Sequence, residues 1–296
     1  MDDAGHFPVM RQEVLALLAP AGKRTIVDCT VGLGGHAEAL LEAAGPQAVL
    51  IGVDLDPRNL LKTKERLARF EGRFRLFEAN FADVDEVLRE AGVASADAVL
   101  ADLGVCSVHL DEPGRGFSFQ SDGPLDMRMG AAGPSAADLV NRWNEAELAE
   151  VIWRYGEERF SRRIARAIVE ARRHGRIERT GQLAEIVWRA LGGRRGRRIH
   201  PATRTFQAIR IAVNRELENL QHLVEKSLQF LSVGGRVAII SYHSLEDRVV
   251  KQQFIAAART GKYRLVTKKP HRPDATEVGE NPRSRSARLR AIERIW

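Results

Sequence analysis

Acidic side chains and glycines near the start of the chain are spaced as in sites for nucleotide-like cofactors. The stretch Ile26–Leu41 reads IVDCTVGLGGHAEALL, in which an apolar run ends at Asp28 and three glycines follow. Gly32, Gly34 and Ala37 satisfy the loose dinucleotide pattern G-x-G-x-x-G/A. Neither Lys-Ser nor Lys-Thr follows these glycines, which excludes a phosphate-binding P-loop.

Two further acids fall where a cofactor site needs them. Asp54 ends an apolar run twenty-two positions after Gly32, as expected of the acid that binds a ribose hydroxyl. Asp102 ends a fourth such run, and Asn80 and Phe81 follow the third. Since ligands of open α/β sheets bind at the carboxyl ends of strands, we expect these residues to line one pocket. Each acid taken alone is more typical of a turn or a helix cap.

The number of carboxylates favours S-adenosylmethionine over a dinucleotide as the cofactor. Acids near the glycine loop would repel a pyrophosphate, whereas S-adenosylmethionine carries an ammonium and a sulfonium that Asp28 and Asp102 would attract. The glycines would let the backbone approach the methionine part closely. A nicotinamide-dependent oxidoreductase stays an alternative, because Gly32, Gly34 and Asp54 alone would also fit it.

Strand-like and helix-like segments alternate in the first hundred residues. Strands are predicted over 24–29, 48–53, 73–78 and 97–101, and helices over 35–44, 57–70 and 84–90. This alternation predicts a parallel sheet covered by helices on both faces. The chain is then helical from Ser135 to Leu191, and its last part predicts one long helix over 205–231, a strand over 234–241, a helix over 245–259 and strands over 263–269 and 286–296.

The simplest domain organisation is an α/β core, residues 1–110 and 203–296, interrupted by a helical insertion over 111–202. Basic charge is concentrated in one region: Arg154 to Arg215 contains seventeen Arg and five Glu with no Lys or Asp, a net charge of +12, against +7 for the whole chain. Regional basicity of this kind favours binding to the phosphate backbone of a nucleic acid. An Arg-rich helical face that is paired with Glu or solvated is the structural alternative.

Composition is that of an ordinary globular protein of 296 residues, with 44% hydrophobic and 29% charged residues. No apolar run approaches the roughly 20 residues of a membrane span, and MDDAGHFPVM lacks a signal-peptide core, so we expect a cytoplasmic protein with no membrane partner. Cys29 and Cys106 lie far apart and outside any metal-type spacing. We therefore predict neither a disulfide nor a bound metal.

Several long stretches are characteristic of one family. They are HFPVM, DCTVGLGGHAEALL, GVDLDP, DLGVCSVHLDEPGRGFSFQSDGPLDMRM, YGEERFSRRIARAIV, HPATRTFQAIRIAVNRELENL, GGRVAIISYHSLEDRVVK and NPRSRSARLR. Nearly end to end, the sequence resembles the MraW (RsmH) family of bacterial small-subunit rRNA methyltransferases. The resemblance implies a class I, Rossmann-like S-adenosylmethionine-dependent methyltransferase core with a helical insertion domain for substrate recognition.

The same resemblance implies an activity and a partner. The reaction would be methyl transfer from S-adenosylmethionine to the exocyclic N4 of one cytidine in the decoding region of 16S rRNA. The partner would be 16S rRNA within the 30S subunit, although naked rRNA and the oligomeric state stay open. A non-catalytic rRNA-binding module with a relic pocket and a DNA cytosine-N4 methyltransferase are the competing hypotheses.

The family's donor site can be transferred onto this chain residue by residue. Besides Gly32 of the glycine pattern, it falls on Gly34, Gly35, His36, Asp54, Phe81, Asp102 and, at its last position, His109. The family's DLGVSSPQLD is DLGVCSVHLD here, so Cys106, Val108 and His109 depart from the pattern. A histidine at that position can still hydrogen-bond, but it can also become charged near a cationic donor.

The acceptor side of the reaction is less well marked. The cytosine amine is a poor nucleophile, and Asp102 at its strand end is the predicted catalytic group that receives the amine proton. No aromatic residue directly follows Asp102, so the residue that stacks on the base is sought among Phe117, Phe119, Tyr242 and His243.

One loop is a candidate for the base pocket. It reads DGPLDMRM, Asp122 to Met129, and we expect it to line the pocket with Asp126 and Arg128 as polar contacts. An internal Asp–Arg pair that only fixes the loop is an equally good interpretation.

Overall fold

The computed structural model describes residues 8–104, 112–130, 132–193 and 200–296, which form two compact units. The first unit comprises Met1–Gly104 with Leu217–Trp296, and the second comprises Val105–Glu216. The second boundary therefore lies later than the predicted 203, because helix α10 (Thr203–Asn214) belongs to the second unit. Helix α10 packs on α7 (Glu145–Gly156) so closely that a Cβ on Gly156 would lie 2.6 Å from the carbonyl oxygen of Arg204.

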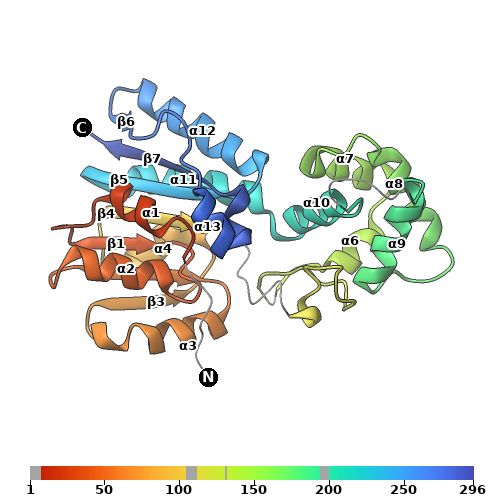
Figure 1. The fold of residues 1–296 in the computed structure, drawn as a ribbon, viewed down its shortest axis with the longest axis horizontal. Helices are drawn as coiled ribbons and strands as arrows, with labels where there is room; N and C mark the ends of the chain where they lie inside the picture. The colour runs from red at the N-terminus through yellow and green to blue at the C-terminus, as the bar shows by residue number, and fades with distance from the viewer. Residues whose placement is uncertain (1–7, 105–111, 131, 194–199) are drawn as a thin grey trace. The chain divides into compact units, whose positions relative to one another are not determined.

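The first unit is built on a seven-stranded sheet with the order β3-β2-β1-β4-β5-β7-β6 (Figure 1). Strands β1 to β5 are parallel, and β7 runs antiparallel to both of its neighbours. This order, with an antiparallel strand beside β5, confirms the predicted α/β class and its Rossmann-like methyltransferase type. The strands are β1 Thr25–Asp28, β2 Val49–Asp54, β3 Phe74–Glu78, β4 Ala96–Asp102, β5 Leu231–Ser241, β6 Tyr263–Leu265 and β7 Arg288–Arg294.

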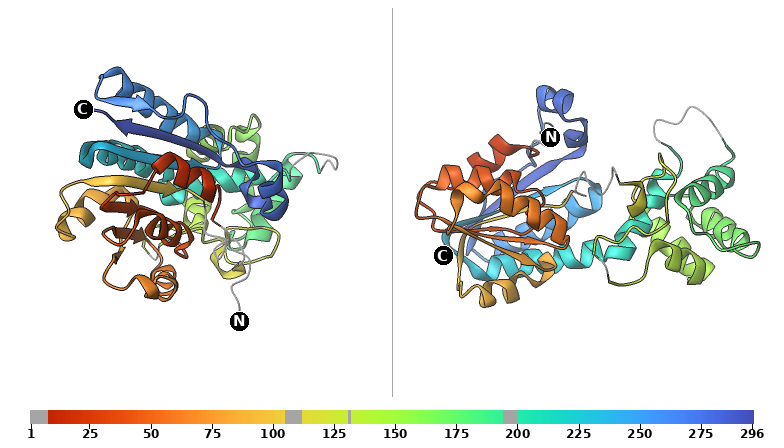
Figure 2. Two further views of the ribbon diagram at one scale, coloured as in Figure 1. Left: turned by 60° about the vertical axis from the view of Figure 1, so that its left-hand side comes forward. Right: turned by 90° about the horizontal axis from the view of Figure 1, so that it is seen from below.

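Helices cover both faces of this sheet, as the views of Figure 2 show. Alternate residues of each strand point to opposite faces, so Ile26 and Val27 of β1 enter different apolar clusters. One cluster is closed by α1 and α2 and the other by α4, α11 and α12. The helices of this unit are α1 Arg11–Leu18, α2 Gly35–Ala44, α3 Pro57–Arg66, α4 Val84–Glu90, α11 Glu216–Phe230, α12 Ser244–Arg259 and α13 Ala275–Glu280.

The second unit has a helical core of its own. Its helices are α6 Ala136–Arg142, α7, α8 Ser161–Ala171, α9 Thr180–Ala190 and α10, and their apolar faces form one buried cluster. Capping boxes start two of them: Ser135 with Asp138 begins α6, and Asn144 with Glu147 begins α7. These caps satisfy backbone N–H groups that have no partner within the helix.

The single long helix predicted over 205–231 is wrong. It is two helices, α10 and α11, separated at Arg215, which has a left-handed backbone with φ 50° and ψ 38°. The apolar periodicity continues on both sides of the break without Gly or Pro, so the sequence carries no local signal for it. Within the described ranges, no helix is both long and apolar enough to cross a bilayer.

Candidate functional site

The strand order reverses between β1 and β4, and the acids that end these strands lie at that point. Asp28 pairs in register with Leu100, so the two strands end beside each other. The backbone N–H of Asp102 donates to Oγ1 of Thr30 over 2.6 Å, which joins the end of β4 to the loop after β1. Ligands of doubly wound sheets bind at such a reversal, so the residues expected from the sequence to line the donor site lie at this point.

The glycine loop between β1 and α2 is held in conformations that suit glycine. Gly32 and Gly34 have φ values of 52° and 78°. The hydroxyl of Thr63 donates to the carbonyl oxygen of Gly32 over 2.6 Å, and a Cβ on Gly34 would lie only 3.0 Å from Cγ2 of Thr63. At Gly35 the added Cβ would be 3.3 Å from the Pro8 ring. The loop is therefore packed too tightly for side chains at these positions.

Asp54 shapes this loop from the end of β2. Its Oδ2 accepts from the backbone N–H of Gly32 at 2.9 Å, and its Oδ1 accepts from that of Asp56 at 2.8 Å. The amide of Asn59 donates to both oxygens. Asp54 thus connects the glycine loop to the start of α3, in addition to any role toward a ribose.

Asp28 is a buried carboxyl group with one oxygen left over. Only 1% of its surface is exposed, its Oδ1 accepts from the backbone N–H of Thr30, and its Oδ2 has no hydrogen-bond partner in the described structure. Burial raises the pKa of Asp28 to about 6, although His36 acts in the opposite direction. An unpartnered buried carboxyl oxygen is costly unless a cation or a donor completes it, so this position suits a cationic ligand group.

His36 and Asp102 face each other at this edge of the sheet. His36 lies in the first turn of α2 and is 8% exposed. Its Nε2 is 3.7 Å from Oδ2 of Asp102, too far for a hydrogen bond, and has no other partner among the described residues. The site therefore contains two buried polar atoms, this nitrogen and Oδ2 of Asp28, that a ligand can satisfy.

An aromatic side chain reaches Asp102 from the neighbouring strand. Tyr242 directly follows β5, and its hydroxyl lies near the carboxylate of Asp102. Burial, together with the Asp102 carboxylate, raises the pKa of the Tyr242 hydroxyl well above its usual value. The backbone N–H groups of Tyr242 and His243 both donate to Oε2 of Glu246, which fixes the turn between β5 and α12. Of the four candidate aromatic residues, Tyr242 is the one near Asp102.

The other candidates have structural partners. His243 is the N-cap of α12, where its Nδ1 accepts from the backbone N–H of Glu246. The ring of Phe119 packs on that of His200 at a tilt, with centroids 4.6 Å apart, and Phe117 is 8% exposed. Nδ1 of His200 accepts from the N–H of Ala202 in the turn before α10.

The Tyr242 ring lies against the backbone of Gly104, which gives a first testable prediction. A Cβ at Gly104 would be 2.8 Å from Cε2 of Tyr242, so Gly104→Ala must displace the ring. Because small displacements in an active site are costly, we expect single-turnover methyl transfer to fall about a hundredfold. The matched control is Gly175→Ala, where the added Cβ meets open space. Equal rates in the two variants would show that the ring position does not matter.

Phe81 lies at the same edge of the sheet, while one predicted residue cannot be placed. Phe81 begins a 3-10 turn, Phe81–Asp83, after β3, is partly buried and packs against the core. Asn80 accepts from the N–H of Ala82 and so caps that turn. His109 lies outside the described residues, as do Cys106 and Val108.

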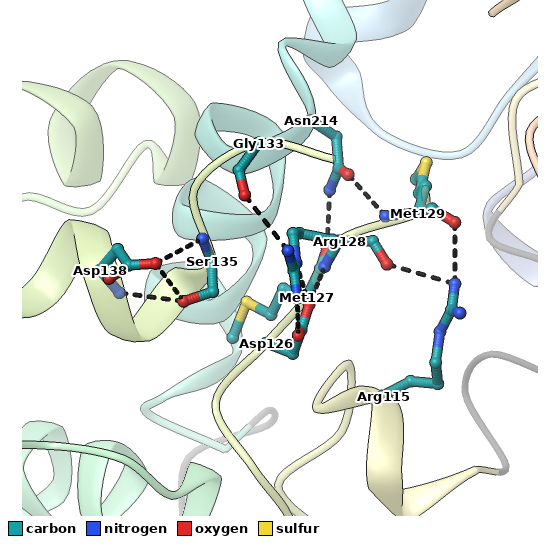
Figure 3. A network of polar contacts seen from close by, with 9 residues as sticks. All are labelled: Arg115, Asp126, Met127, Arg128, Met129, Gly133, Ser135, Asp138 and Asn214. Atoms are coloured by element: carbon teal, nitrogen blue, oxygen red, sulfur yellow. Dashed lines mark hydrogen bonds and ion pairs between the residues drawn. The ribbon is translucent and has the colours of Figure 1, made fainter. Parts of the chain in front are cut away.

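The predicted substrate loop of the second unit is a tightly bonded segment (Figure 3). Nε and Nη2 of Arg128 donate to Oδ1 and Oδ2 of Asp126 at 2.9 and 2.7 Å. Burial raises the pKa of Asp126, but the Arg128 hydrogen bonds outweigh it and hold that pKa below its usual value. The structure thus contains the internal Asp–Arg pair that the sequence left as an alternative.

Two residues outside the motif fasten this loop to the rest of its unit (Figure 3). The Arg115 side chain donates to the carbonyl oxygens of Arg128 and Met129 at 3.2 and 2.8 Å. The Asn214 amide accepts from the N–H of Met129 and donates to the carbonyl oxygen of Met127, both at 2.8 Å. Met127 has a left-handed φ of 61°, which these bonds hold in place.

The chain matches the family model described as the MraW methylase family over residues 3–295. It belongs to the MraW methylase family. The relatives named ribosomal RNA small subunit methyltransferase H include one from Methylobacterium sp. (strain 4-46), 48% identical over 99% of this chain and 92% of the relative. Another, from Geotalea uraniireducens (strain Rf4), is 48% identical with both chains covered completely.

A weaker likeness is found among solved structures. The rRNA methylase from Streptococcus thermophilus is 12% identical, has a TM-score of 0.44, and is matched over 97% of this chain and 94% of its own. Because this structural similarity is low, the assignment of the family depends on the family model, and that of the fold on the strand order.

This MraW methylase is a methyltransferase that uses S-adenosylmethionine, as the sequence predicted. The side chains at the ends of β1 and β4 suit that cofactor, because Oδ2 of Asp28 and Nε2 of His36 are buried polar atoms without partners among the described residues. A carboxylate beside the glycine loop suits the donor's cationic groups and would disfavour a pyrophosphate. This chemistry also argues against the nicotinamide alternative.

Sequence reasoning missed several residues of the site. Thr30 and Glu277 both act on the backbone: Thr30 accepts from Asp102, and Oε1 of Glu277 accepts from the N–H of Met10 at 2.6 Å. Arg115 and Asn214 were missed in the second unit. Each is a single polar residue without a motif of its own, and only its partner far along the chain shows its role.

Proposed function

We propose that this methylase transfers the methyl group of S-adenosylmethionine to the exocyclic N4 of a cytidine in the decoding region of 16S rRNA, within the 30S subunit. The observation that carries the proposal is the pair of acids, Asp28 and Asp102, at the reversal of the sheet. The name of the relatives, ribosomal RNA small subunit methyltransferase H, supports an rRNA substrate. The cytoplasm, where that rRNA is found, is the proposed compartment.

The donor would be held by both backbone and side chains. Gly32, Gly34 and Gly35 give it a close approach to the main chain, Asp54 reaches the ribose and Phe81 the adenine. Asp28 suits the ammonium group of the methionine part, since its free oxygen is buried beside the loop. His36 and Asp102 complete the site, with His109 as its last member.

Asp102 is the proposed catalytic residue. Bound S-adenosylmethionine supplies an electrophilic methyl group on a positively charged sulfur. The cytosine amine must lose a proton as its nitrogen forms the new bond to carbon and the sulfur–carbon bond breaks. The Asp102 carboxylate, 21% exposed at the end of β4, accepts a hydrogen bond from the amine and then that proton. The neutral thioether leaves with the sulfur–carbon electron pair.

Tyr242 would supply the aromatic surface for the base. The ring comes from the end of β5, next to β4, and lies against Gly104 and near Asp102. Stacking on an aromatic ring holds an unpaired base in a pocket. A hydrogen bond from the phenol would keep Asp102 oriented toward the amine.

Asp126 and Arg128 would act as a preformed pair whose exposed edges meet the substrate. Their side chains are 30% and 31% exposed, so each keeps an accessible surface although they bind each other. The pair also fixes the loop, so only an experiment can separate its structural role from a role in substrate contact.

Arg128→Ala separates them. The change leaves the Asp126 carboxylate without its bidentate partner, so we expect the free energy of unfolding to fall by about 1–3 kcal/mol. We also expect weaker binding to 30S subunits. Denaturant unfolding and a binding titration measure the two effects. Arg142→Ala is the control. That side chain is 74% exposed, and its ion pair with Asp138 is longer, at 3.5 Å, than the pair of Arg128 with Asp126. Full methylation with unchanged RNA affinity would remove the substrate contact from the proposal.

The central experiment is transfer of a tritiated methyl group to unmodified 30S subunits, followed by nucleoside mapping of the product. We expect label in N4-methylcytidine at one position. Naked 16S rRNA and double-stranded DNA, offered as competitors, test the particle requirement and the DNA hypothesis. Binding without incorporation would favour a non-catalytic rRNA-binding module instead.

A further inference from the structure

Exposed arginines gather at the start of α8. Arg162, Arg163 and Arg166 lie on the helix, and Arg159 lies in the turn just before it. Arg166 is 3.4 Å from Glu145, so it is not counted with the other three. The opposite face of the helix is apolar and buried in the core of the second unit through Ile164, Ala165 and Ile168. The arginines are therefore not needed for packing.

The end of α7 adds an exposed aromatic ring and a further arginine next to this face. Trp153 is 58% exposed, and Arg154 follows it as a second exposed residue. Only the short link between α7 and α8, which pack against each other, separates them from Arg159. We call Trp153, Arg154, Arg159, Arg162 and Arg163 the α7–α8 corner.

Acidic residues do not neutralise this corner. Elsewhere on the second unit exposed arginines have acidic partners, as in the pairs Arg173–Glu170 at 2.8 Å and Arg189–Glu185 at 2.6 Å. Among the described residues, neither Arg162 nor Arg163 forms such a pair.

The acid just before Arg159 is directed elsewhere. The buried carboxylate of Glu158 accepts from the N–H of Phe160 and lies 3.9 Å from Arg204. The positive charge of the corner therefore faces solvent.

The arrangement also runs against helix stability. The first turn of α8 contains no acid, and Arg162 and Arg163 occupy it instead. Acids stabilise a helix N-terminus and cations destabilise it, because of the helix macrodipole. Charges that weaken the helix they belong to indicate a role outside folding.

We propose that the α7–α8 corner binds the phosphate backbone of the rRNA substrate, with Trp153 stacking on an unpaired base. Clustered arginines with an exposed aromatic ring match single-stranded nucleic acid, in which phosphates and accessible bases alternate. The inference rests on the proposed function and deepens it, since it names a surface of the second unit that holds the RNA.

The test compares two double variants. Arg162→Ala with Arg163→Ala removes unpaired charge from the corner, and Arg173→Ala with Arg189→Ala removes two exposed but paired arginines as the control. Affinity for unmodified 30S subunits is measured at several salt concentrations. We expect the corner variant to lower the slope of log affinity against log salt by about 2 and the control to change it little. Trp153→Ala should weaken binding about tenfold with an unchanged slope.

Two outcomes would overturn the proposal. In the first, the corner variant has the same affinity and salt slope as the control, although wild type binds and methylates 30S subunits. The further inference then fails, and the proposed function is unaffected. In the second, the wild-type protein neither binds nor methylates 30S subunits, in which case the proposed function fails as well. Unchanged affinity for S-adenosylhomocysteine in every variant shows that the core remains folded.

Discussion

Replacing Asp102 by asparagine is expected to slow methyl transfer about a thousandfold, a much larger effect than the loss of donor affinity that follows from removing one carboxylate near the cationic donor. The amide has nearly the same shape and can still accept a hydrogen bond from the cytosine amine. It cannot take up the proton that the amine must lose. Single-turnover transfer to unmodified 30S subunits measures the chemical step, and a titration with S-adenosylhomocysteine measures the donor site.

The control for this variant is Asp83→Asn, which removes an exposed carboxylate from the same unit. We expect it to behave as wild type. If Asp102→Asn kept more than a tenth of the wild-type rate, another group would have to receive the proton.

The second large effect is a pH dependence of stability that originates at Asp28. Its pKa in the folded protein is about 6, above the ordinary value of 3.8, because the carboxyl is buried. The folded state therefore binds the proton more tightly than the unfolded state does. Between about pH 4 and pH 6 the contribution of Asp28 becomes less favourable as the pH rises, and above pH 6 it costs about 3 kcal/mol.

Asp28→Asn removes this titration, so the comparison with wild type isolates it. The free energy of unfolding of the variant minus that of wild type should rise by about 3 kcal/mol from pH 4 to pH 7. Any pH-independent cost of the amide cancels in this difference. The pH-dependent contributions of carboxylates whose pKa is lowered, such as Asp126 and Asp247, cancel as well. Urea unfolding across this range measures it. A difference that stays flat with pH would mean that the carboxyl is not desolvated.

The strands and helices of the first hundred residues were predictable because their signals are local. Helices α2 and α4 have the predicted bounds, and strands β1 to β4 agree within one or two residues. Apolar runs that end in an acid mark buried parallel strands, and Asp28, Asp54 and Asp102 do end theirs. The position proposed for the donor site follows from that register alone.

Features that depend on distant contacts were not predictable. Tyr242 and Asp102 belong to different segments of the chain, and only the pairing of β4 with β5 brings them together. Helix α1 has left-handed residues at both ends, Met10 and Ala19, and no side-chain cap, so the usual start signal is missing. The break at Arg215 likewise arises beside Asn214, whose amide bonds the substrate loop.

The place of the second unit within the chain has a consequence for synthesis on the ribosome. Strand β4 ends at Asp102, but its partner β5 begins only at Leu231, so the whole second unit is translated between two adjacent strands. The second unit has its own apolar cluster and can collapse as soon as it emerges. Until β5 is made, the backbone N–H and C=O groups along that edge of β4 stay unpaired. The nascent chain thus completes the second unit before the sheet of the first unit. The unpaired edge of β4 is the point at which the chain is most exposed to wrong pairing with other chains.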